Sequence, residues 1–323
     1  YSTSETIWSH VERLEHLVVL GGGPVGCELA QAFARLDCQV TQVVRTGLMG
    51  REDADAVALV EAALRADGVR VLTQTDAIRC ERETGMQLLV VRYEDGTEEA
   101  LPFDAILCAV GRSARTEGFG LEELGIPVSP KHTIETDAWL QTLYPNIYAC
   151  GDVAGPYQFT HTAAHQGWYA SANALFGGLK RFKVDYSVIP WATFTSPEVA
   201  RVGLSEGEAR ERGIACEVTR YDLKDLDRAI ADEAAHGFVK VLSIPGKDRI
   251  LGVTIVGEHA SDLLAEFVLA MKHGLGLNKI LGTIHTYPTW SEANKYAAGE
   301  WRRAHVPYRL LDWAEKYHAW RRG

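Results

Sequence analysis

The stretch "LVVLGGGPVGCELAQAF", residues 17–33, decides the fold of this chain. Its apolar run over 17–20 predicts a buried strand, and the apolar residues that recur at helical spacing after the glycines predict a helix over 26–36. The glycines between them, at positions 21, 23 and 26, fit the pattern G-x-G-x-x-G. In this strand–turn–helix context the pattern predicts a dinucleotide site rather than a purely structural turn.

Each glycine of the pattern has its own task. Gly21 allows the tight turn, Gly23 lets a pyrophosphate approach the backbone, and Gly26 permits close packing of helix and strand. The anion would lie at the N-terminus of the helix, where free backbone N–H groups and the helix dipole favour negative charge. The predicted phosphate-binding turn consists of Gly21, Gly23, Pro24, Val25 and Gly26.

Strand and helix patterns alternate through the first 110 residues. A strand, a helix and a strand are predicted over 39–44, 53–66 and 69–73, and further strands over 87–93 and 105–110. Such alternation is typical of a parallel sheet with helices on its faces. We therefore expect an α/β fold with a Rossmann-like sheet.

The end of the second strand, "QVVRTGLMGRED", bears on which nicotinamide dinucleotide binds. NAD-binding units usually place an acidic residue about 20 positions after the glycines, where it binds the ribose 2′-hydroxyl. Val44 occupies that position here. Arg45 and Arg51 follow, and guanidinium groups at this place would bind a 2′-phosphate. The alternative is two solvated arginines balanced by neighbouring acidic residues. We favour NADPH over NADH.

Composition and charge narrow the class of partner. The formal net charge is −10, which argues against nucleic acid or an anionic membrane as the main partner. No apolar stretch approaches the roughly 20 residues that span a bilayer. The six cysteines form no CxxC or CxxxxC pair, and most lie in strand-like apolar runs, as in reduced cytosolic proteins. We expect a cytoplasmic protein with no metal site and no membrane span.

The sequence changes in character from Gly111 onward. It is first rich in turn residues, and then predicts a long helix over 162–176, a β-hairpin within 237–257, a helix over 261–273, and one or two helices over 289–321. The tail from Val306 has apolar residues at helical spacing. It could contact a membrane surface or a partner, and we favour a helix packed on its own domain or on a dimer.

Four motifs occur in a fixed order along the chain: "GGGPVGCELA", "LCAVGR", "NIYACGDVAG" and "FTSPEVARVGLSEGEA". With them the chain resembles the pyridine nucleotide–disulfide oxidoreductases, a family that includes dihydrolipoamide dehydrogenase, glutathione reductase and mercuric reductase. The resemblance runs from about residue 3 to residue 300. It implies a flavoprotein oxidoreductase in which NADPH gives hydride to FAD, and electrons then pass to a disulfide, a metal or another acceptor.

The resemblance also implies a domain order. Members of the family begin with an FAD-binding segment that has its own GxGxxG and a redox-active CxxxxC. Neither is present here, so we interpret the chain as the C-terminal portion of such an enzyme. The expected parts are a connecting segment (1–15), a Rossmann NAD(P)-binding domain (16–110), the C-terminal part of the FAD-binding domain (111–185), an α+β dimerisation domain (186–305) and a C-terminal helix (306–323).

The resemblance assigns flavin contacts as well. Asp152 of the Gly-Asp motif would bind the ribityl chain of FAD, and a helix starting near Thr162 would point its positive end at the flavin. Without the resemblance, this Gly-Asp pair reads as a turn and helix cap. The remaining residues assigned to the cofactors are Gly111, Gln158, Phe159, Thr160 and His161.

The motif "IHTYPTWSEANKYAAGEW" is similar to the signature of the family's dimerisation domain. In the disulfide reductases the residue before the proline is a histidine, held by a glutamate five positions on, that acts across the dimer interface as general acid–base. Here that position is Tyr287, and Glu292 is kept. A tyrosine, with an ordinary pKa of about 10, is a poor proton shuttle at neutral pH. Dihydrolipoamide or glutathione chemistry is therefore in doubt.

Further catalytic candidates come from the same resemblance. Mercuric reductase is similar in having tyrosine at this position, but its C-terminal vicinal cysteine pair is not present here. His285 is a possible substitute acid–base, and we favour the alternative of a hydrogen-bonded interface residue. Glu28 would lie near the nicotinamide and the flavin, where family members pair it with a lysine of the FAD segment. We therefore expect Glu28 to lack that lysine partner in this chain.

These observations predict a homodimer that uses FAD and NADP and acts on a small-molecule or disulfide substrate. The alternative is a non-catalytic dimerising module that lacks flavin, and a third possibility is a nicotinamide-nucleotide binder without turnover. The sequence leaves the terminal acceptor open among mercuric ion, a low-molecular-weight disulfide and a quinone.

Overall fold

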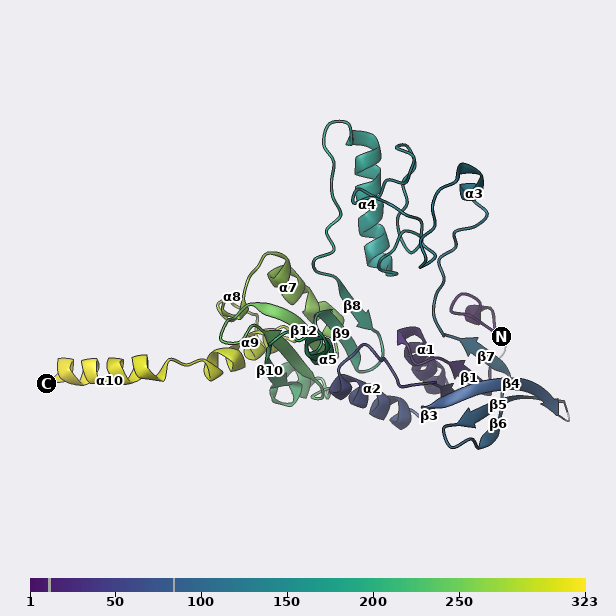
Figure 1. Ribbon diagram of the computed structural model, residues 1–323. Coiled ribbons are helices and arrows are strands. Elements are labelled where there is room, and N and C mark those ends of the chain that lie inside the picture. The colour runs from purple at the N-terminus through teal and green to yellow at the C-terminus, as the bar shows by residue number, and fades with distance from the viewer. Residues whose placement is uncertain (11–12, 84) are drawn as a thin grey trace. The chain divides into compact units, whose positions relative to one another are not determined.

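The computed structural model describes residues 1–10, 13–83 and 85–323. It divides into two compact units, one formed by Tyr1–Val110 with Pro190–Gly323 and the other by Gly111–Ile189 (Figure 1). Within the expected connecting segment 1–15, a short 3-10 helix, η1, covers Ile7–Ser9. Residues 11 and 12 of that segment lie outside the described residues.

A parallel sheet forms the nucleotide-binding part of the first unit. Its strand order is β3-β2-β1-β7, and every pairing in it is parallel. This confirms the predicted α/β fold. The central strand is buried over residues 17–19, as expected for a parallel sheet that is covered on both faces. The strands are His16–Leu20 (β1), Gln39–Val43 (β2), Arg70–Leu72 (β3) and Ala105–Cys108 (β7).

Two helices cover one face of this sheet. Helix α1 (Pro24–Arg35) begins two residues before the predicted start, because a proline in the first turn is already fixed in a helical φ and has no N–H to lose. Helix α2 spans Ala54–Ala66. Their buried side chains, among them Ala30 and Leu64, join Leu17 and Val19 of β1 in one core cluster.

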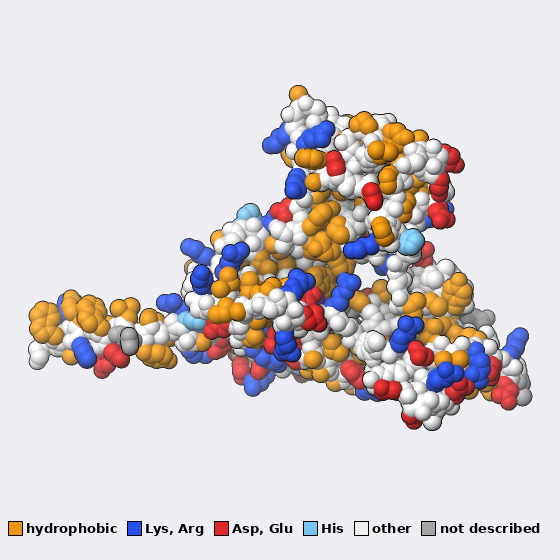
Figure 2. Space-filling model, in the orientation of Figure 1, with side chains coloured by type: hydrophobic (Ala, Val, Ile, Leu, Met, Phe, Trp, Pro, Cys, Tyr) orange, Lys and Arg blue, Asp and Glu red, His pale blue; other side chains and the backbone are white. Residues whose placement is uncertain are grey.

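A three-stranded antiparallel sheet covers the other face. Its order is β4-β5-β6, from Thr75–Glu83 (β4), Met86–Tyr93 (β5) and Glu98–Pro102 (β6). Only the middle strand was predicted, because β4 is mostly polar and exposed and β6 is short and mostly exposed. The sheet packs apolar side chains against Val18 of β1. Its outer surface carries arginines and glutamates close together (Figure 2).

The second unit has little regular structure. Helix α3 covers Leu121–Leu124, and the long helix α4 covers Thr160–Phe176. The helix α4 begins two residues before the predicted start. Its buried Gln166 and Asn173 bind the surrounding loops through side-chain hydrogen bonds, so polar side chains organise this unit as much as apolar packing does.

The remainder of the first unit is an antiparallel sheet of order β10-β11-β12-β9-β8 with helices packed on it. The predicted hairpin is confirmed as the antiparallel pair β11–β12. Its strands are Pro190–Thr193 (β8), Glu198–Gly203 (β9), Glu217–Asp222 (β10), Phe238–Ser243 (β11) and Ile250–Gly257 (β12). The helices are Glu206–Glu211 (α5), Leu223–Asp225 (η2), Asp227–Ala231 (α6), Ala260–Lys272 (α7), Leu277–Leu281 (α8) and Glu292–Ala304 (α9).

The last helix, α10 (Tyr308–Arg322), does not show one of the two favoured arrangements, packing on its own domain, and its packing on a dimer stays a prediction. Its large apolar side chains are exposed (Figure 2), so they do not pack on the chain's own domain. These side chains are Tyr308, Leu310, Leu311, Trp313, Tyr317 and Trp320. Among the described residues, no helix has the length and apolar character needed to cross a membrane.

Candidate functional site

The glycine turn between β1 and α1 is packed so tightly that three of its positions have no room for a side chain. Gly21 has a φ of +115°, and a Cβ on it would lie 2.4 Å from the carbonyl oxygen of Ala109. A Cβ on Gly26 would lie 2.4 Å from the carbonyl oxygen of Gly21. Gly22 is equally constrained, because its Cβ would lie 2.6 Å from Cγ1 of Val44. The sequence pattern does not include Gly22.

Gly23 is the open position of the turn. A Cβ built on it would meet no described atom within 4 Å, and its φ of −76° suits any residue. It immediately precedes α1, whose first N–H groups have no partner within the helix. The turn therefore leaves one gap, at the place where an anion can approach the backbone and the helix N-terminus.

Gln42 of β2 binds the backbone of this turn. Its side chain is fully buried, and its amide donates a hydrogen bond of 2.9 Å to the carbonyl oxygen of Gly21. The same amide lies 3.6 Å from the Sγ of Cys27. Sequence analysis missed Gln42, although one signal was available: a glutamine in the middle of a predicted buried strand needs a polar partner.

The segment 44–53 lies beside the glycine turn. The N–H of Met49 donates a hydrogen bond of 2.7 Å to the carbonyl oxygen of Gly22. Val44 is buried and has no polar side-chain atom with which to bind a ribose hydroxyl. Arg45 and Arg51 have exposed side chains, and Arg45 lies 3.4 Å from Asp76 in an exposed ion pair. Such a pair is weak and can be exchanged for a phosphate.

Glu28 of α1 has a partner within the chain, in place of the lysine that the resemblance implies. Its Oε1 accepts a hydrogen bond of 2.8 Å from the backbone N–H of Phe194. One turn along the same helix, Gln31 accepts from the N–H of Ser196 and donates to its carbonyl oxygen, both at 2.8 Å. The residues after β8 thereby hold α1.

In the second unit, Asp152 lies at a glycine turn that α4 holds. Gly151 has a φ of +81°, and its N–H donates a hydrogen bond of 2.5 Å to Oε1 of the buried Gln166. The amide of Gln166 donates to the carbonyl oxygen of Gly155 and to the hydroxyl of Tyr186, both at 2.7 Å. Asp152 itself stays accessible, 3.8 Å from the guanidinium of Arg112. Sequence analysis missed Gln166.

The segment before α4 brings several of the predicted cofactor residues together. The rings of Phe159 and His161 stack with centroids 5.2 Å apart, and Thr160 begins the helix. Gln158 is half-buried, and Thr160 and His161 are exposed at the N-terminal end of the helix. Gly111, at the start of this unit, has a φ of +137°.

The dimerisation motif places Tyr287 differently from the expected pairing. Its hydroxyl donates a hydrogen bond of 3.0 Å to Oδ2 of Asp227, not to Glu292. This bond and the negative charge of Asp227 raise the pKa of Tyr287, which is exposed. Glu292 is buried, accepts a bond from the hydroxyl of Tyr296 at 3.2 Å, and lies 3.4 Å from the N–H of Thr289. Asp227 was not among the predicted site residues.

His285 is bound through both ring nitrogens. Its Nδ1 lies 3.0 Å from the carbonyl oxygen of Thr283, and its Nε2 lies 3.0 Å from Oε1 of Glu266. Asn294 donates to the other carboxylate oxygen of Glu266 at 2.9 Å. Both ring nitrogens therefore face oxygen atoms that accept hydrogen bonds. Among the described residues, no cluster of His, Cys, Asp and Glu could hold a metal ion.

Two domain models of one protein family match this chain. The family described as "Pyridine nucleotide-disulphide oxidoreductase" matches residues 1–167, and its "dimerisation domain" matches residues 189–298. The mercuric reductase of Streptomyces lividans is 35% identical over 298 residues, which cover 92% of this chain and 62% of that protein. A dihydrolipoyl dehydrogenase of Thermus scotoductus is 36% identical over 303 residues, covering 91% and 65%.

Solved structures with a similar fold cover most of this chain. LpdA from Mycobacterium tuberculosis matches 94% of this chain and 64% of its own, with 28% identity and a TM-score of 0.83. The HOCl-induced flavoprotein disulfide reductase RclA from Escherichia coli matches 92% of this chain and 67% of its own, with 27% identity and a TM-score of 0.83. The chain spans a little under two thirds of the length of the curated relatives that it matches.

Proposed function

The chain belongs to the pyridine nucleotide-disulphide oxidoreductase family, and from this membership we propose that it binds a nicotinamide dinucleotide at Gly21–Gly26. One observation carries the proposal. Gly21, Gly22 and Gly26 have no space for a Cβ, whereas Gly23 has open space beside the start of α1. A pyrophosphate needs this combination of a rigid turn and one open approach to backbone N–H groups.

The bound dinucleotide is NADPH in this proposal. Val44 supplies no acceptor for a ribose 2′-hydroxyl, and the exposed guanidinium groups of Arg45 and Arg51 lie on the segment that contacts the glycine turn. Two positive charges there favour a 2′-phosphate over a hydroxyl, because guanidinium–phosphate bonds are charge-assisted and often bidentate.

The second proposed cofactor is FAD, held in part by the second unit. The residues present fit such a group: Asp152 offers an accessible carboxylate to hydroxyls, and Gln166 fixes the turn beside it. The exposed start of α4 at Thr160 offers a positive helix end. When bound, FAD accepts hydride from the nicotinamide and passes electrons to an acceptor.

The acceptor is a small molecule or a disulfide, and the acting species is a homodimer. The match of residues 189–298 to a dimerisation domain supports the dimer. The exposed Tyr287 would face the acceptor in the partner subunit. Because Asp227 raises its pKa, the phenol remains protonated at neutral pH and does not act as a base there.

Absorption and titration measurements on the purified protein test this function. The expected result is the visible absorption band of an oxidised flavin, tighter binding of NADPH than of NADH, and a gel-filtration mass of two chains. A colourless protein that still dimerises would support a non-catalytic module instead. Tight binding of NADH without binding of NADPH would contradict the roles of Arg45 and Arg51.

A further inference from the structure

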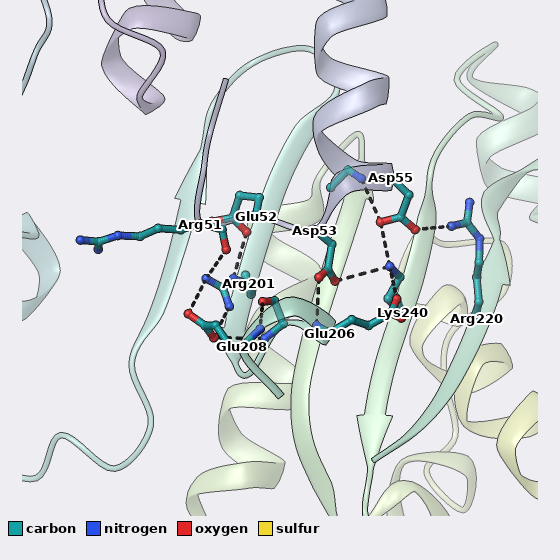
Figure 3. A network of polar contacts seen from close by, with 11 residues as sticks. Arg51, Glu52, Asp53, Asp55, Arg201, Glu206, Glu208, Arg220 and Lys240 are labelled. Atoms are coloured by element: carbon teal, nitrogen blue, oxygen red, sulfur yellow. Dashed lines mark hydrogen bonds and ion pairs between the residues drawn. The ribbon is translucent and has the colours of Figure 1, made fainter. Parts of the chain in front are cut away.

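A buried cluster of charges joins the segment after β2 to the five-stranded antiparallel sheet that contains β9 (Figure 3). Its centre is Arg201 of β9, whose side chain is 0% exposed. The Nε of Arg201 lies 2.9 Å from Glu52, and its Nη1 lies 2.7 Å from Glu208 of α5. Its Nη2 donates a hydrogen bond of 2.9 Å to the backbone carbonyl oxygen of Arg51. We call these four residues the Arg201 cluster.

The Arg201 cluster is held from further sides. The guanidinium lies over the ring of Trp191, 4.3 Å from its centroid, and the indole N–H of Trp191 donates to Glu52 at 2.8 Å. Burial raises the pKa of Glu52, although Arg201 opposes this effect. A buried guanidinium is costly to desolvate and is tolerated only with well-placed partners. Because losing any of these partners would leave a buried charge uncompensated, the side chains of the cluster hold one another in place.

A second group of charges lies beside the first and serves a different part of the chain. The Nζ of Lys240, whose side chain is 4% exposed, lies 3.4 Å from Asp53, 2.7 Å from Asp55 and 2.6 Å from Glu206. Asp53 precedes α2 and Asp55 lies in its first turn. This Lys240 cluster therefore fixes the start of α2, and it makes no bond to the backbone of Arg51 among the described contacts.

The partner of Arg201 that bears on function is the backbone of Arg51. In Figure 3 the side chain of Arg51 points away from the charges of the cluster, and it is exposed. The segment is also tied to the glycine turn, since Met49 donates to Gly22 and accepts from the N–H of Glu52 at 2.8 Å. With the peptide fixed on both sides, the direction in which Arg51 leaves the backbone is fixed as well.

We propose that Arg201 is a positioning residue for nucleotide selection: by holding the carbonyl group of Arg51, it presents the guanidinium of Arg51 to the 2′-phosphate of NADPH. The inference rests on the proposed function, because it requires that Arg51 binds that phosphate. Arg201 itself is buried, so its proposed role is to act through Arg51 and not by direct contact. Through Arg201, the five-stranded sheet that contains β9 contributes to the choice between NADPH and NADH.

Binding titrations of NADPH and NADH with two variants test the proposal. Arg201→Lys keeps the buried charge but loses the planar fork that reaches three partners at once. The double variant R201Q/E52Q removes the charge of Arg201 together with that of its partner Glu52. No unpaired buried carboxylate is then left at position 52. We expect the dissociation constant of NADPH to rise about fivefold or more in each, and that of NADH to change less than about twofold.

Lys240→Gln is the matched control, because it removes a similarly buried charge of β11 that binds the start of α2 and makes no described bond to Arg51. We expect it to lower the melting temperature while the ratio of the two dissociation constants stays at the wild-type value. Circular dichroism verifies that each variant is folded. An unchanged ratio in the folded Arg201 variants, or an equal change in the control, would overturn the proposal.

The same titrations separate this inference from the proposed function. A wild-type protein that binds NADH as tightly as NADPH refutes the NADPH assignment, and the role of Arg201 falls with it. A wild-type preference for NADPH that Arg51→Ala abolishes but both Arg201 variants retain refutes the positioning role alone.

Discussion

A Cβ on Gly22 would lie 2.6 Å from Cγ1 of Val44 and 3.0 Å from the carbonyl oxygen of Gly47. The glycine turn and the segment after β2 are therefore in direct van der Waals contact at a residue outside the G-x-G-x-x-G pattern. This contact fixes the proposed pyrophosphate turn relative to the segment proposed to bind the adenosine ribose.

Alanine at Gly22 should affect mainly stability, whereas alanine at Gly23 should affect mainly binding. Gly22→Ala forces a methyl group into Val44 and should lower the free energy of unfolding by about 1–3 kcal/mol. Gly23→Ala meets no described atom within 4 Å and should leave stability nearly unchanged while it weakens binding of the dinucleotide. Thermal denaturation and NADPH titration of both variants measure this. Equal loss of stability in the two would contradict the packing described.

Replacing Arg51 by alanine should weaken binding of NADPH and leave binding of NADH almost unaffected. Loss of one charge-assisted bond to the 2′-phosphate raises the dissociation constant by about tenfold or more. Increasing salt concentration should reduce the wild-type preference, because an exposed contact is screened. Arg65→Ala is a suitable control, since Arg65 lies at the far end of α2.

Gln166→Leu should destabilise the turn that presents Asp152. The variant leaves the buried N–H of Gly151 without its acceptor, which costs about 1–3 kcal/mol. We expect a lower melting temperature and weaker retention of FAD, measured by the absorption of flavin released on dilution. Gln87→Leu is the control, because Gln87 is exposed on β5 and is not among the predicted cofactor residues. Unchanged stability of Gln166→Leu would show that the turn does not depend on this side chain.

Tyr287 should titrate above the ordinary range of tyrosine. The bond to Asp227 stabilises the neutral phenol over the phenolate, so the pKa is raised. Asp227→Asn should move the pKa of Tyr287 downward, because the carboxylate charge that opposes ionisation is gone. The difference between alkaline absorbance titrations of each protein and its Tyr287→Phe counterpart isolates this group. A pKa that does not fall in Asp227→Asn would mean that the bond is absent in solution.

Cys27 should be inert toward thiol reagents while the protein is folded. Burial raises its pKa to about 11, so at neutral pH the side chain is a protonated, inaccessible thiol. Cys80 and Cys150 are exposed and should react first. In the double variant C80S/C150S, modification of Cys27 is expected only after denaturation, as followed by peptide mass spectrometry. Rapid modification of Cys27 under native conditions would contradict its burial.

The regular elements of the nucleotide-binding part were predictable because their signals are local. The apolar run of β1, the glycine turn and the apolar stripe of α1 are contiguous, so one stretch of sequence specifies all three. The strand β4 was missed because its residues are mostly exposed and charged, and β6 was missed because it is short and mostly exposed. Their pairing with β5 depends on backbone hydrogen bonds and on arginine–glutamate pairs, which leave no apolar alternation.

The candidate site could be proposed from the sequence where a motif is contiguous, and not where it depends on contacts between distant segments. The glycines of the turn could be read from the pattern, whereas Gln42, Asp227 and Gln166 act through partners far away along the chain. The contact of Glu28 with Phe194 has the same character. A single sequence contains no record of such pairs, and only the folded backbone brings them together.

The core of the first unit has a consequence for how the protein is made. It joins Leu17 and Leu107 with Val199, Phe238 and Val256, yet the whole second unit is encoded between these two groups. During synthesis on a ribosome, the parallel sheet of the first 110 residues keeps part of its apolar surface uncovered until Val256 has emerged. Chaperones that bind nascent chains would act during that interval, when exposed apolar surface favours aggregation.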